Sequence, residues 1–264
     1  MSDKPESVGN EVLYEVKDHI AVVTLNRPDK RNAVNGAVAS ALGWICEETE
    51  RDPEVRACIL TSSLESTFCA GADLSEISKG NAAALSTKAG GFAGFVKFPR
   101  TKPWIAAVRG NALAGGCELP LSCDMIVAAD DSRFGLPEVK RGIFAGAGGV
   151  FRLPRALPRN IALEIVATGD PMPAERMYQL GLVNRMVSSD KVLEEAKSLA
   201  AQIGVNAPLA VQKSLEVARQ AFEGTEEELW KKSNAASAVV FSSEDAKEGP
   251  RAFLEKRAPV WKGK

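Results

Sequence analysis

The sequence contains only one histidine, His19, among its 264 residues. This scarcity excludes metal sites built from several histidines, and a Ser-His-Asp or Cys-His mechanism would have to rest on His19 alone. His19 lies between Asp18 and Ile20, where we expect a hairpin turn. Any proton transfer must therefore come from Glu, Asp, Lys, Tyr or Cys side chains, and no metal is expected.

An excess of charge and long apolar runs are lacking as well. The 33 basic and 34 acidic residues give a net charge of −1, so no field attracts nucleic acid or an anionic membrane. No apolar stretch approaches the roughly 20 residues of a membrane span. Residues 1–10 are polar and contain no apolar signal core, so secretion is not expected.

Cysteine is sparse and shows no pairing pattern. The five cysteines are odd in number, include no Cys-x-x-Cys motif, and lie within or beside apolar segments. Reduced thiols are the simplest interpretation, and we expect a cytoplasmic location. The positions are Cys46, Cys58, Cys69, Cys117 and Cys123.

The composition that is present, 45% hydrophobic and 25% charged, is typical of a globular domain, and the length suits one large domain or a domain with an appendage. Residues 12–16 and 20–25 predict a β-hairpin, and apolar runs predict buried strands at 55–61, 104–108 and 124–129. Helical segments separate these strands, which indicates βα units and a mostly parallel sheet. Residues 80–100 are expected to form a flexible, partly helical segment that lines a pocket.

Further helices and one more strand are predicted towards the C-terminus. The strand is expected at 182–187. Helices are predicted at 35–51, 115–122, 148–157, 160–168, 173–180, 189–205, 208–222, 225–241 and 243–256. Pro120 is expected to shorten or kink the helix at 115–122.

Residues 111–118 form the most informative stretch, because two adjacent glycines precede a carboxylate. Gly115 and Gly116 permit a sharp turn and leave N–H groups free at the first turn of a helix, where they attract an anion. Glu118 follows as a candidate for proton transfer beside a carbonyl. A plain strand-to-helix turn with a solvated Glu118 explains this stretch equally well.

Three other segments carry candidate functional groups. Residues 68–76 predict a strand, a small-residue turn and a helix capped by Asp73, which again exposes N–H groups. The basic turn at 26–32 is either a solvated loop or a phosphate grip through Lys30 and Arg31. Glu138 opens a short helix after a Gly-Leu-Pro turn, and residues 145–149 form a second glycine cluster.

Taken together, these segments resemble the crotonase (enoyl-CoA hydratase/isomerase) superfamily along nearly the whole chain. The matching motifs are NRPDKRNA at 26–33, FCAGADL at 68–74, KPWIAAVRGNA at 102–112, AGGCEL at 114–119, FGLPE at 134–138, GAGG at 146–149, ATGD at 167–170, GLVN at 181–184 and EGPRAFLEKR at 248–257. Each motif is weak alone, but nine in register are specific. Residues 157–187 and the C-terminal end look most like carnitinyl-CoA dehydratase-type members.

The resemblance implies an α/β fold, a spiral of repeated ββα units with a C-terminal helical region used for trimerisation. It divides the chain into a flexible N-terminus at 1–10, a core with a CoA-thioester site at 11–200, and the helical region at 201–264. A homotrimer or a dimer of trimers is implied. The ligand is an acyl-CoA, so coenzyme A is part of the substrate and no separate cofactor is expected.

The resemblance also assigns roles to residues. Ala72 and Gly115 correspond to the oxyanion hole, Glu118 to the base that activates water, and Glu138 to the proton donor to Cα. Gly146 corresponds to the residue whose N–H holds the water. The implied CoA contacts are Lys30, Arg31, Ala33, Ala70, Asp73 and Leu74, with Phe253 and Lys256 reaching the CoA of a neighbouring subunit; a core Phe and a solvated Lys are the alternatives for the last two.

These residues imply a lyase that adds water to a trans-2-enoyl-CoA or catalyses the reverse dehydration. Three alternatives stay open: carnitinyl-CoA dehydration specifically, a Δ3-Δ2 enoyl-CoA isomerase, and a non-catalytic CoA-binding protein. The isomerase needs only one carboxylate, so the presence of both disfavours it. Two departures from the pattern concern the second carboxylate, because Leu136 stands where known hydratases carry a Gln and Ala145 replaces a common Pro.

Overall fold

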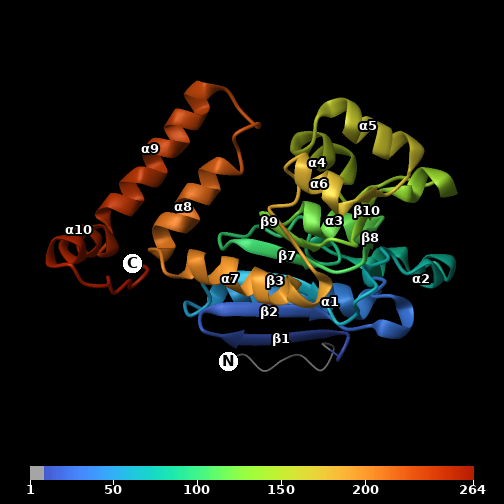
Figure 1. The fold of residues 1–264 in the computed structure, drawn as a ribbon, viewed down its shortest axis with the longest axis horizontal. Helices are drawn as coiled ribbons and strands as arrows, with labels where there is room; N and C mark the ends of the chain where they lie inside the picture. Colours follow the sequence, from blue (N-terminus) through green and yellow to red (C-terminus); the bar gives the residue numbers. More distant parts are fainter. Residues whose placement is uncertain (1–8) are drawn as a thin grey trace.

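The computed structural model describes residues 9–264, which form two larger sheets and one two-stranded sheet with helices around them (Figure 1). The larger sheet has six strands in the order β1 (Val12–Lys17), β2 (Ile20–Leu25), β3 (Ala57–Ser62), β7 (Trp104–Val108), β9 (Met125–Ala129) and β12 (Arg185–Val187). All neighbouring pairs are parallel except the β1–β2 hairpin. The predicted hairpin and mostly parallel sheet are confirmed.

Both faces of the central strands β2, β3, β7 and β9 are buried, which explains why these strands are continuous apolar runs. Alternate residues such as Val22, Ile59 and Ile105 pack against helix α7 (Val192–Gly204). The residues between them, such as Val23 and Leu60, face helix α1 (Gly36–Arg51) and the rest of the core. The period of two along each strand therefore divides the apolar residues between two layers.

The smaller sheet has four strands in the order β11 (Met172–Pro173), β10 (Arg133–Gly135), β8 (Asn111–Leu113) and β4 (Thr67–Cys69). Strands β4, β8 and β10 are parallel to one another, whereas β10 and β11 are antiparallel. Three successive units, β3–β4, β7–β8 and β9–β10, each place one strand in each sheet. Helices α2 (Leu74–Ser78), α3 (Gly115–Leu121) and α4 (Gly149–Ala156) follow these units, so the expected ββα spiral is confirmed.

The smaller sheet was not foreseen in full, because the sequence pattern predicted β4 but neither β8 nor β10. Both strands are three residues long, too short for a period of two to be visible. They matter for function because parallel strands end at one common edge. The segments that follow β4, β8 and β10 therefore meet there.

Residues 82–92 are a short 3-10 helix and a hairpin that line a cavity, so the helical part and the pocket wall expected at 80–100 are present, whereas the hairpin was not predicted. The elements are η2 (Ala82–Leu85), β5 (Ser86–Thr87) and β6 (Gly91–Phe92). Gly91 and Gly94 have φ angles of +63° and +67°, which break any helix in this stretch. The chain then turns inward, and Phe95 is fully buried beside Trp104.

The remaining elements surround the sheets or extend from them. Near the sheets lie the helices α5 (Arg159–Thr168) and α6 (Ala174–Gln179) and the 3-10 turns η1 (Pro28–Lys30), η3 (Pro137–Arg141) and η4 (Ser189–Lys191). The other predicted helices are present within a few residues of their expected ends. None of the helices among residues 9–264 is long and apolar enough to cross a membrane. The part of the predicted flexible N-terminus at 1–8 lies outside the described residues.

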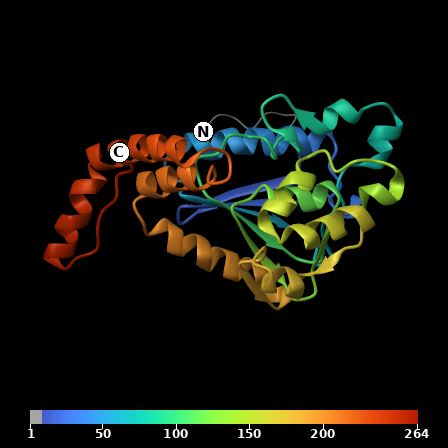
Figure 2. The ribbon, with the colours of Figure 1, turned by 90° about the horizontal axis from the view of Figure 1, so that it is seen from above.

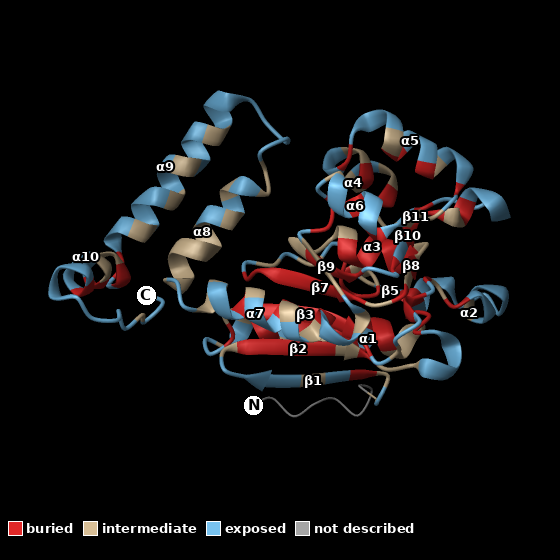
Figure 3. Cartoon of the chain, in the orientation of Figure 1, coloured by how far each residue is buried: buried red, intermediate tan, exposed pale blue. Residues whose placement is uncertain are grey.

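Residues 208–264 form a C-terminal arm of three helices, α8 (Pro208–Ala218), α9 (Glu226–Ser242) and α10 (Asp245–Glu255), which extends from the two sheets (Figures 1 and 2). Helix α9 buries none of its residues, and its surface is almost entirely exposed (Figure 3). The chain end folds back on the arm's base, where Trp261 Nε1 donates a hydrogen bond of 2.7 Å to Val205 O. The arm therefore has a defined shape although it presents exposed apolar side chains such as Phe241 and Phe253.

Candidate active site

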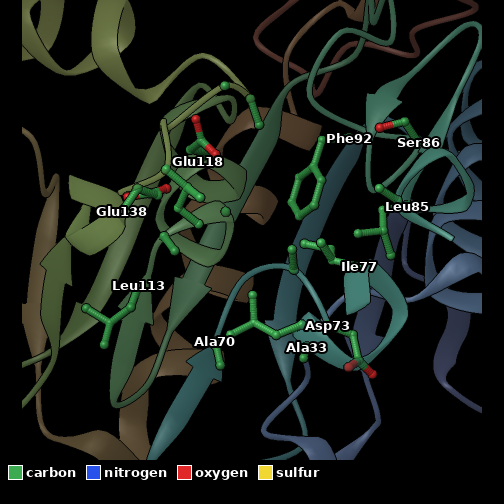
Figure 4. A pocket seen from close by; sticks show the side chains of 18 of the residues that line it. Ala33, Ala70, Asp73, Ile77, Leu85, Ser86, Phe92, Leu113, Glu118 and Glu138 are labelled. Carbon is green, nitrogen blue, oxygen red and sulfur yellow. The ribbon is translucent and has the colours of Figure 1, made fainter. Parts of the chain in front are cut away.

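A cavity of about 1280 Å³ lies at the edge of the smaller sheet where β4, β8 and β10 end. Glu118 and Glu138 lie on one side of it, and Phe92, Leu85 and Ile77 lie on the facing side (Figure 4). Eleven of the thirteen residues predicted from the sequence line this cavity. They are Lys30, Arg31, Ala33, Ala70, Ala72, Asp73, Leu74, Gly115, Glu118, Glu138 and Gly146.

The two small-residue turns pack directly against each other. Gly71 has a φ of +90°, and a Cβ placed on it would lie 3.0 Å from both Ala114 Cβ and Gly115 N. Ala72 and Val34 form an isolated parallel bridge, in which Val34 N–H donates to Gly71 O and Asp73 N–H donates to Val34 O. The N–H of Ala72 takes no part in this bridge. Within residues 9–264, neither Ala72 N–H nor Gly115 N–H has a hydrogen-bond acceptor. Two neighbouring donors at a cavity wall are therefore available to one oxygen atom of a ligand.

The position of Gly115 depends on tight packing around the first turn of α3. Ala114, the residue before it, has a φ of +54°, which costs an L-amino acid about 1–3 kcal/mol. A side chain at Gly115 would meet the Phe92 ring at 2.6 Å, and one at Gly116 would meet Cys69 O at 2.0 Å. Only glycine at both positions lets α3 approach β4 and keeps the N–H of Gly115 at the cavity. Pro120 lies in the last turn of this helix, which ends at Leu121.

Glu118 is held firmly from the second glycine cluster. Its side chain is 3% exposed, and Oε1 accepts a 2.8 Å hydrogen bond from Gly149 N–H. Burial raises the pKa of Glu118 to about 7, helped by the nearby charge of Glu138. The N–H groups of Gly149 and Ala147 and the charge of Arg152 oppose this rise because they favour the ionised form. A group with such a pKa can exchange a proton near neutral pH.

Glu138 is buried too, but its carboxyl group has fewer hydrogen-bond partners than that of Glu118. It lies in η3 directly after β10, and burial raises its pKa, against weaker opposing effects from its own N–H and from Arg141. Its Oε2 is buried and has no hydrogen-bond partner among residues 9–264. An unpartnered carboxyl oxygen that lines a cavity is positioned to meet a ligand or a water molecule.

Leu136, which departs from the family pattern, is a core residue. It is 1% exposed, and a Cβ placed on Gly149 would lie 2.8 Å from Leu136 Cδ2. The side chain therefore supports the loop that holds Glu118 and offers Glu138 no hydrogen bond. The orientation of Glu138 therefore depends on burial and on its turn.

The glycine cluster has a role that sequence reasoning missed. Gly146 lines the cavity as expected, and its assignment to a water molecule stays a prediction. Ala147 and Gly149 instead supply the N–H groups that hold Glu118. The signal that could have found them is the glycine run itself, since free N–H groups near a helix start attract a carboxylate.

The basic turn lies at the entrance of the cavity. Arg31 and Asn32 have φ angles of +50° and +55°, and the buried Asn32 holds the turn by donating to Ser62 Oγ and Phe68 O. Lys30 and Arg31 remain exposed at the cavity wall. Further cationic residues line the same cavity, namely Lys88, Lys97, Lys140 and Arg141. This distribution of charge favours a ligand with phosphate groups.

Asp73 lines the cavity, but its carboxylate is already bound by protein groups. Oδ2 accepts a 2.7 Å hydrogen bond from Arg27 Nη1, and Oδ1 accepts from the N–H and hydroxyl of Ser75. The Ser75 hydroxyl and Arg27 together lower the pKa of Asp73 to about 2. Asp73 therefore caps α2, as predicted, and fixes the wall to which Leu74 belongs. Its contact with CoA stays a prediction.

Phe253 and Lys256 are the two predicted residues that do not line the cavity. Both lie at the end of α10 in the C-terminal arm, and Phe253 is 83% exposed. The alternative of a core Phe is therefore wrong within this chain. Their proposed role, contact with the CoA of a neighbouring subunit, needs a second chain and stays a prediction.

Comparisons with known proteins identify the family and the fold. A family model described as enoyl-CoA hydratase/isomerase matches residues 15–264. A carnitinyl-CoA dehydratase from Salmonella typhi is 44% identical over 250 residues, which cover 93% of this chain and 95% of that protein. An enoyl-CoA hydratase structure from Mycobacterium tuberculosis has a TM-score of 0.93 and 44% identity, covering 97% of this chain and 100% of its own. A carnitinyl-CoA hydratase structure from Mycobacterium avium has 47% identity with a TM-score of 0.76, at the same coverage.

Proposed function

Because the chain belongs to the enoyl-CoA hydratase/isomerase family, we propose that it is a lyase that adds water to a trans-2-enoyl-CoA and catalyses the reverse dehydration. The observation that carries this proposal is the pair of buried carboxylates, Glu118 and Glu138, on one wall of a cavity that also presents two free N–H groups. Water addition needs one group to activate water and one to protonate Cα, and the site offers both.

The proposed mechanism begins with the thioester oxygen between the N–H groups of Ala72 and Gly115. Negative charge develops on this oxygen when water attacks Cβ of the enoyl group. Two fixed donors in a water-poor cavity stabilise that charge, and loss of one such donor typically costs about 3–4 kcal/mol. Lys30, Arg31 and the other cations at the entrance would bind the phosphates of coenzyme A, and Ala33, Ala70 and Leu74 would contact its body.

The two carboxylates divide the proton transfers. Glu118 is assigned as the base, which acts in its ionised form: burial raises its pKa to about 7, and the hydrogen bond from Gly149 N–H and the charge of Arg152 oppose that rise, so an ionised fraction is present near neutral pH. Glu138 is assigned as the proton donor to Cα, since burial favours its neutral form and its Oε2 has no partner among residues 9–264. In dehydration the roles reverse. Gly146 is assigned to the attacking water, and the proposal requires no cofactor beyond the coenzyme A of the substrate.

A second candidate is specific dehydration of a carnitinyl-CoA, favoured by the relative named carnitinyl-CoA dehydratase at 44% identity. It uses the same two carboxylates on a substrate with a permanent positive charge. An isomerase would leave one of the two buried carboxylates without a role, and a non-catalytic CoA-binding protein would leave both without one.

The test is hydration of crotonyl-CoA, followed by loss of the enoyl absorbance, with the wild type, Glu118→Gln and Glu138→Gln. Each variant should lose about 10²–10⁴-fold in kcat, because removal of one general acid or base has that effect. Glu175→Gln in α6, outside the cavity, is the control and should keep wild-type kcat. A wild type that binds CoA but is inert on enoyl-CoAs of several chain lengths and on carnitinyl-CoA contradicts the proposal.

We further propose a homotrimer, or a dimer of trimers, assembled through the C-terminal arm. The support is the exposed apolar surface of the arm, which includes Trp230, Phe241, Phe253 and Leu254. In that assembly Phe253 and Lys256 would reach a neighbour's CoA. Light scattering should give three or six times 28.1 kDa, and a monomeric mass contradicts the assembly. A cytoplasmic location stays a prediction from the sequence.

A further inference from the structure

Arg152 connects three parts of the site without being a predicted member of it. It lies in α4, three residues after Gly149, and its side chain is half-buried. Nη1 donates a 3.0 Å hydrogen bond to Ala147 O, and Nη2 donates a 2.6 Å hydrogen bond to Val96 O. One guanidinium group therefore ties the glycine cluster to the chain that follows the β5–β6 hairpin.

Both of its partners belong to segments that support reacting groups. The Ala147 loop supplies the N–H groups that hold the Glu118 carboxylate. The hairpin that precedes Val96 carries Phe92, whose ring packs against Gly115 at the two free N–H groups. A rigid, planar fork such as a guanidinium can fix two carbonyl groups at once, which a lysine ammonium does with less geometric control.

The backbone around the Arg152 guanidinium leaves space for this group. Gly148 has a φ of +108°, and a Cβ placed there would lie 2.4 Å from Arg152 Nη1. The guanidinium carbon also lies 5.3 Å from the centre of the Phe151 ring. The group is therefore held between a bare glycine backbone and two carbonyl groups.

The charges around Glu118 come from two packed elements. Glu138 on η3 contributes a negative charge, which opposes ionisation of Glu118, and Arg152 on α4 contributes a positive charge, which favours it. The thiol of Cys117 is the nearest titratable neighbour on α3 itself, and its pKa lies well above the usual range. Arg141 acts on Glu138, while Arg100 and Arg155 act on Arg152. Arg152 is the cation that acts on Glu118 directly.

We propose that Arg152 is a positioning residue for Glu118. It fixes the 145–149 loop against the β5–β6 hairpin, and its positive charge favours the ionised form of Glu118 next to Glu138. The proposal deepens the proposed hydration, in which Glu118 must be ionised to accept a proton from water. Arg152 touches neither substrate nor the reacting atoms in this role.

The test titrates Glu118 directly, so that it does not depend on the activity. The side-chain carboxyl signal of Glu118 is followed by ¹³C NMR against pH in the full-length protein and assigned by its absence in Glu118→Gln. In Arg152→Gln the midpoint should rise measurably, because a nearby opposite charge lowers the pKa of a carboxylate and that charge is removed. In Arg152→Lys, which keeps the charge, the midpoint should stay close to the wild-type value.

The enzymatic readout should follow the same pattern. In Arg152→Gln the acid limb of kcat/KM should move to higher pH by a similar amount, and kcat should fall about tenfold or more because the loop is no longer held. Arg152→Lys should keep the acid limb but lose part of kcat. Arg155→Gln is the matched control and should keep wild-type values. Arg155 lies three residues further along α4 and pairs with Glu223 on the surface.

Two results overturn the proposal. One is a Glu118 midpoint in Arg152→Gln equal to that of the wild type, even if kcat falls, since a merely structural residue lowers the rate without moving the titration. The other, decisive if Arg152→Gln does not fold, is a wild-type kcat in Arg152→Lys. If the wild type hydrates no enoyl-CoA, the proposed function fails, while the NMR titration still decides the role of Arg152.

Discussion

The two carboxylates of the site occupy regions of opposite character. Glu118 lies where α3 and α4 meet, and it is held by N–H groups, a core leucine and a positive charge. Glu138 lies in a short 3-10 turn, with one carboxyl oxygen unpartnered among residues 9–264. The chain after it is exposed and apolar at Ile143 and Phe144, and turns at Gly142 with a φ of +65°.

This difference shows how two residues of one type can acquire different roles. Burial is the largest effect on both and raises the pKa of each, but at Glu118 the fixed N–H groups of the 145–149 loop and the charge of Arg152 oppose that rise. At Glu138 the opposing effects come from its own N–H and from Arg141, and its Oε2 has no hydrogen-bond partner among residues 9–264. The positions differ more in rigidity than in depth of burial, since the two side chains are 3% and 6% exposed.

The largest expected effect comes from a change that disturbs the rigid region alone. In Gly149→Ala the new Cβ would lie 2.8 Å from Leu136 Cδ2 and 3.1 Å from Glu118 Cγ. Overpacking of this kind costs about 1–3 kcal/mol of stability, and a shift of the carboxylate should lower kcat about 10²-fold. Thermal unfolding and crotonyl-CoA hydration measure the two effects.

The matched change in the other region is Gly142→Ala. No atom lies within 4 Å of a Cβ there, so only the left-handed backbone resists the substitution, at about 1–2 kcal/mol. Its kcat should fall far less than that of Gly149→Ala. Equal losses of kcat in both variants would show that the two regions do not differ in rigidity.

A smaller effect is expected on stability and its pH dependence. The pKa of Glu118 is raised from 4.5 to about 7, so the folded protein holds a proton that the unfolded chain releases between these pH values. Glu118 should therefore lower the free energy of unfolding as pH rises from 4.5 to 7, by no more than about 3 kcal/mol from this group. Glu118→Gln lacks this loss and should be the more stable protein at pH 8.

The measurement is urea unfolding of the wild type and Glu118→Gln at pH 5 and pH 8. The difference in the free energy of unfolding between the two proteins should be small at pH 5 and larger at pH 8. Glu164→Gln, on the exposed face of α5, is a control that should leave this difference unchanged. A difference that is constant with pH contradicts the raised pKa.

The smallest effect should come from the exposed apolar side chains after Glu138. Phe144 lines the cavity and is 73% exposed. Phe144→Ser should leave kcat on crotonyl-CoA nearly unchanged and raise KM a few-fold for longer acyl groups, because each buried CH₂ contributes about 0.8 kcal/mol. A steady-state series over acyl lengths tests this, with Phe222→Ser in the C-terminal arm as the control. A KM that changes equally for all acyl-chain lengths would show that Phe144 does not contact the acyl chain.

Much of the fold could be predicted from local patterns. The runs at Val22, Ile59 and Ile105 are apolar on both faces because the sheet is covered on both sides, and this property is visible in the sequence. The glycine turns at Gly71 and Gly115 were visible for a similar reason, because only glycine fits their backbone and packing. The hairpin at 86–92 was missed, since its glycines and alanines carry no periodic signal.

The sequence by itself determined the residue types of the site, the strands of the larger sheet and the turns that expose N–H groups, because these depend on neighbours along the chain. Only the tertiary structure decided how those groups act. It set β4, β8 and β10 parallel, so that Ala72, Gly115 and Glu138 meet at one edge. It also brought Gly149 and Arg152 onto Glu118, and the pKa of a buried carboxyl depends on such contacts between residues distant in the chain.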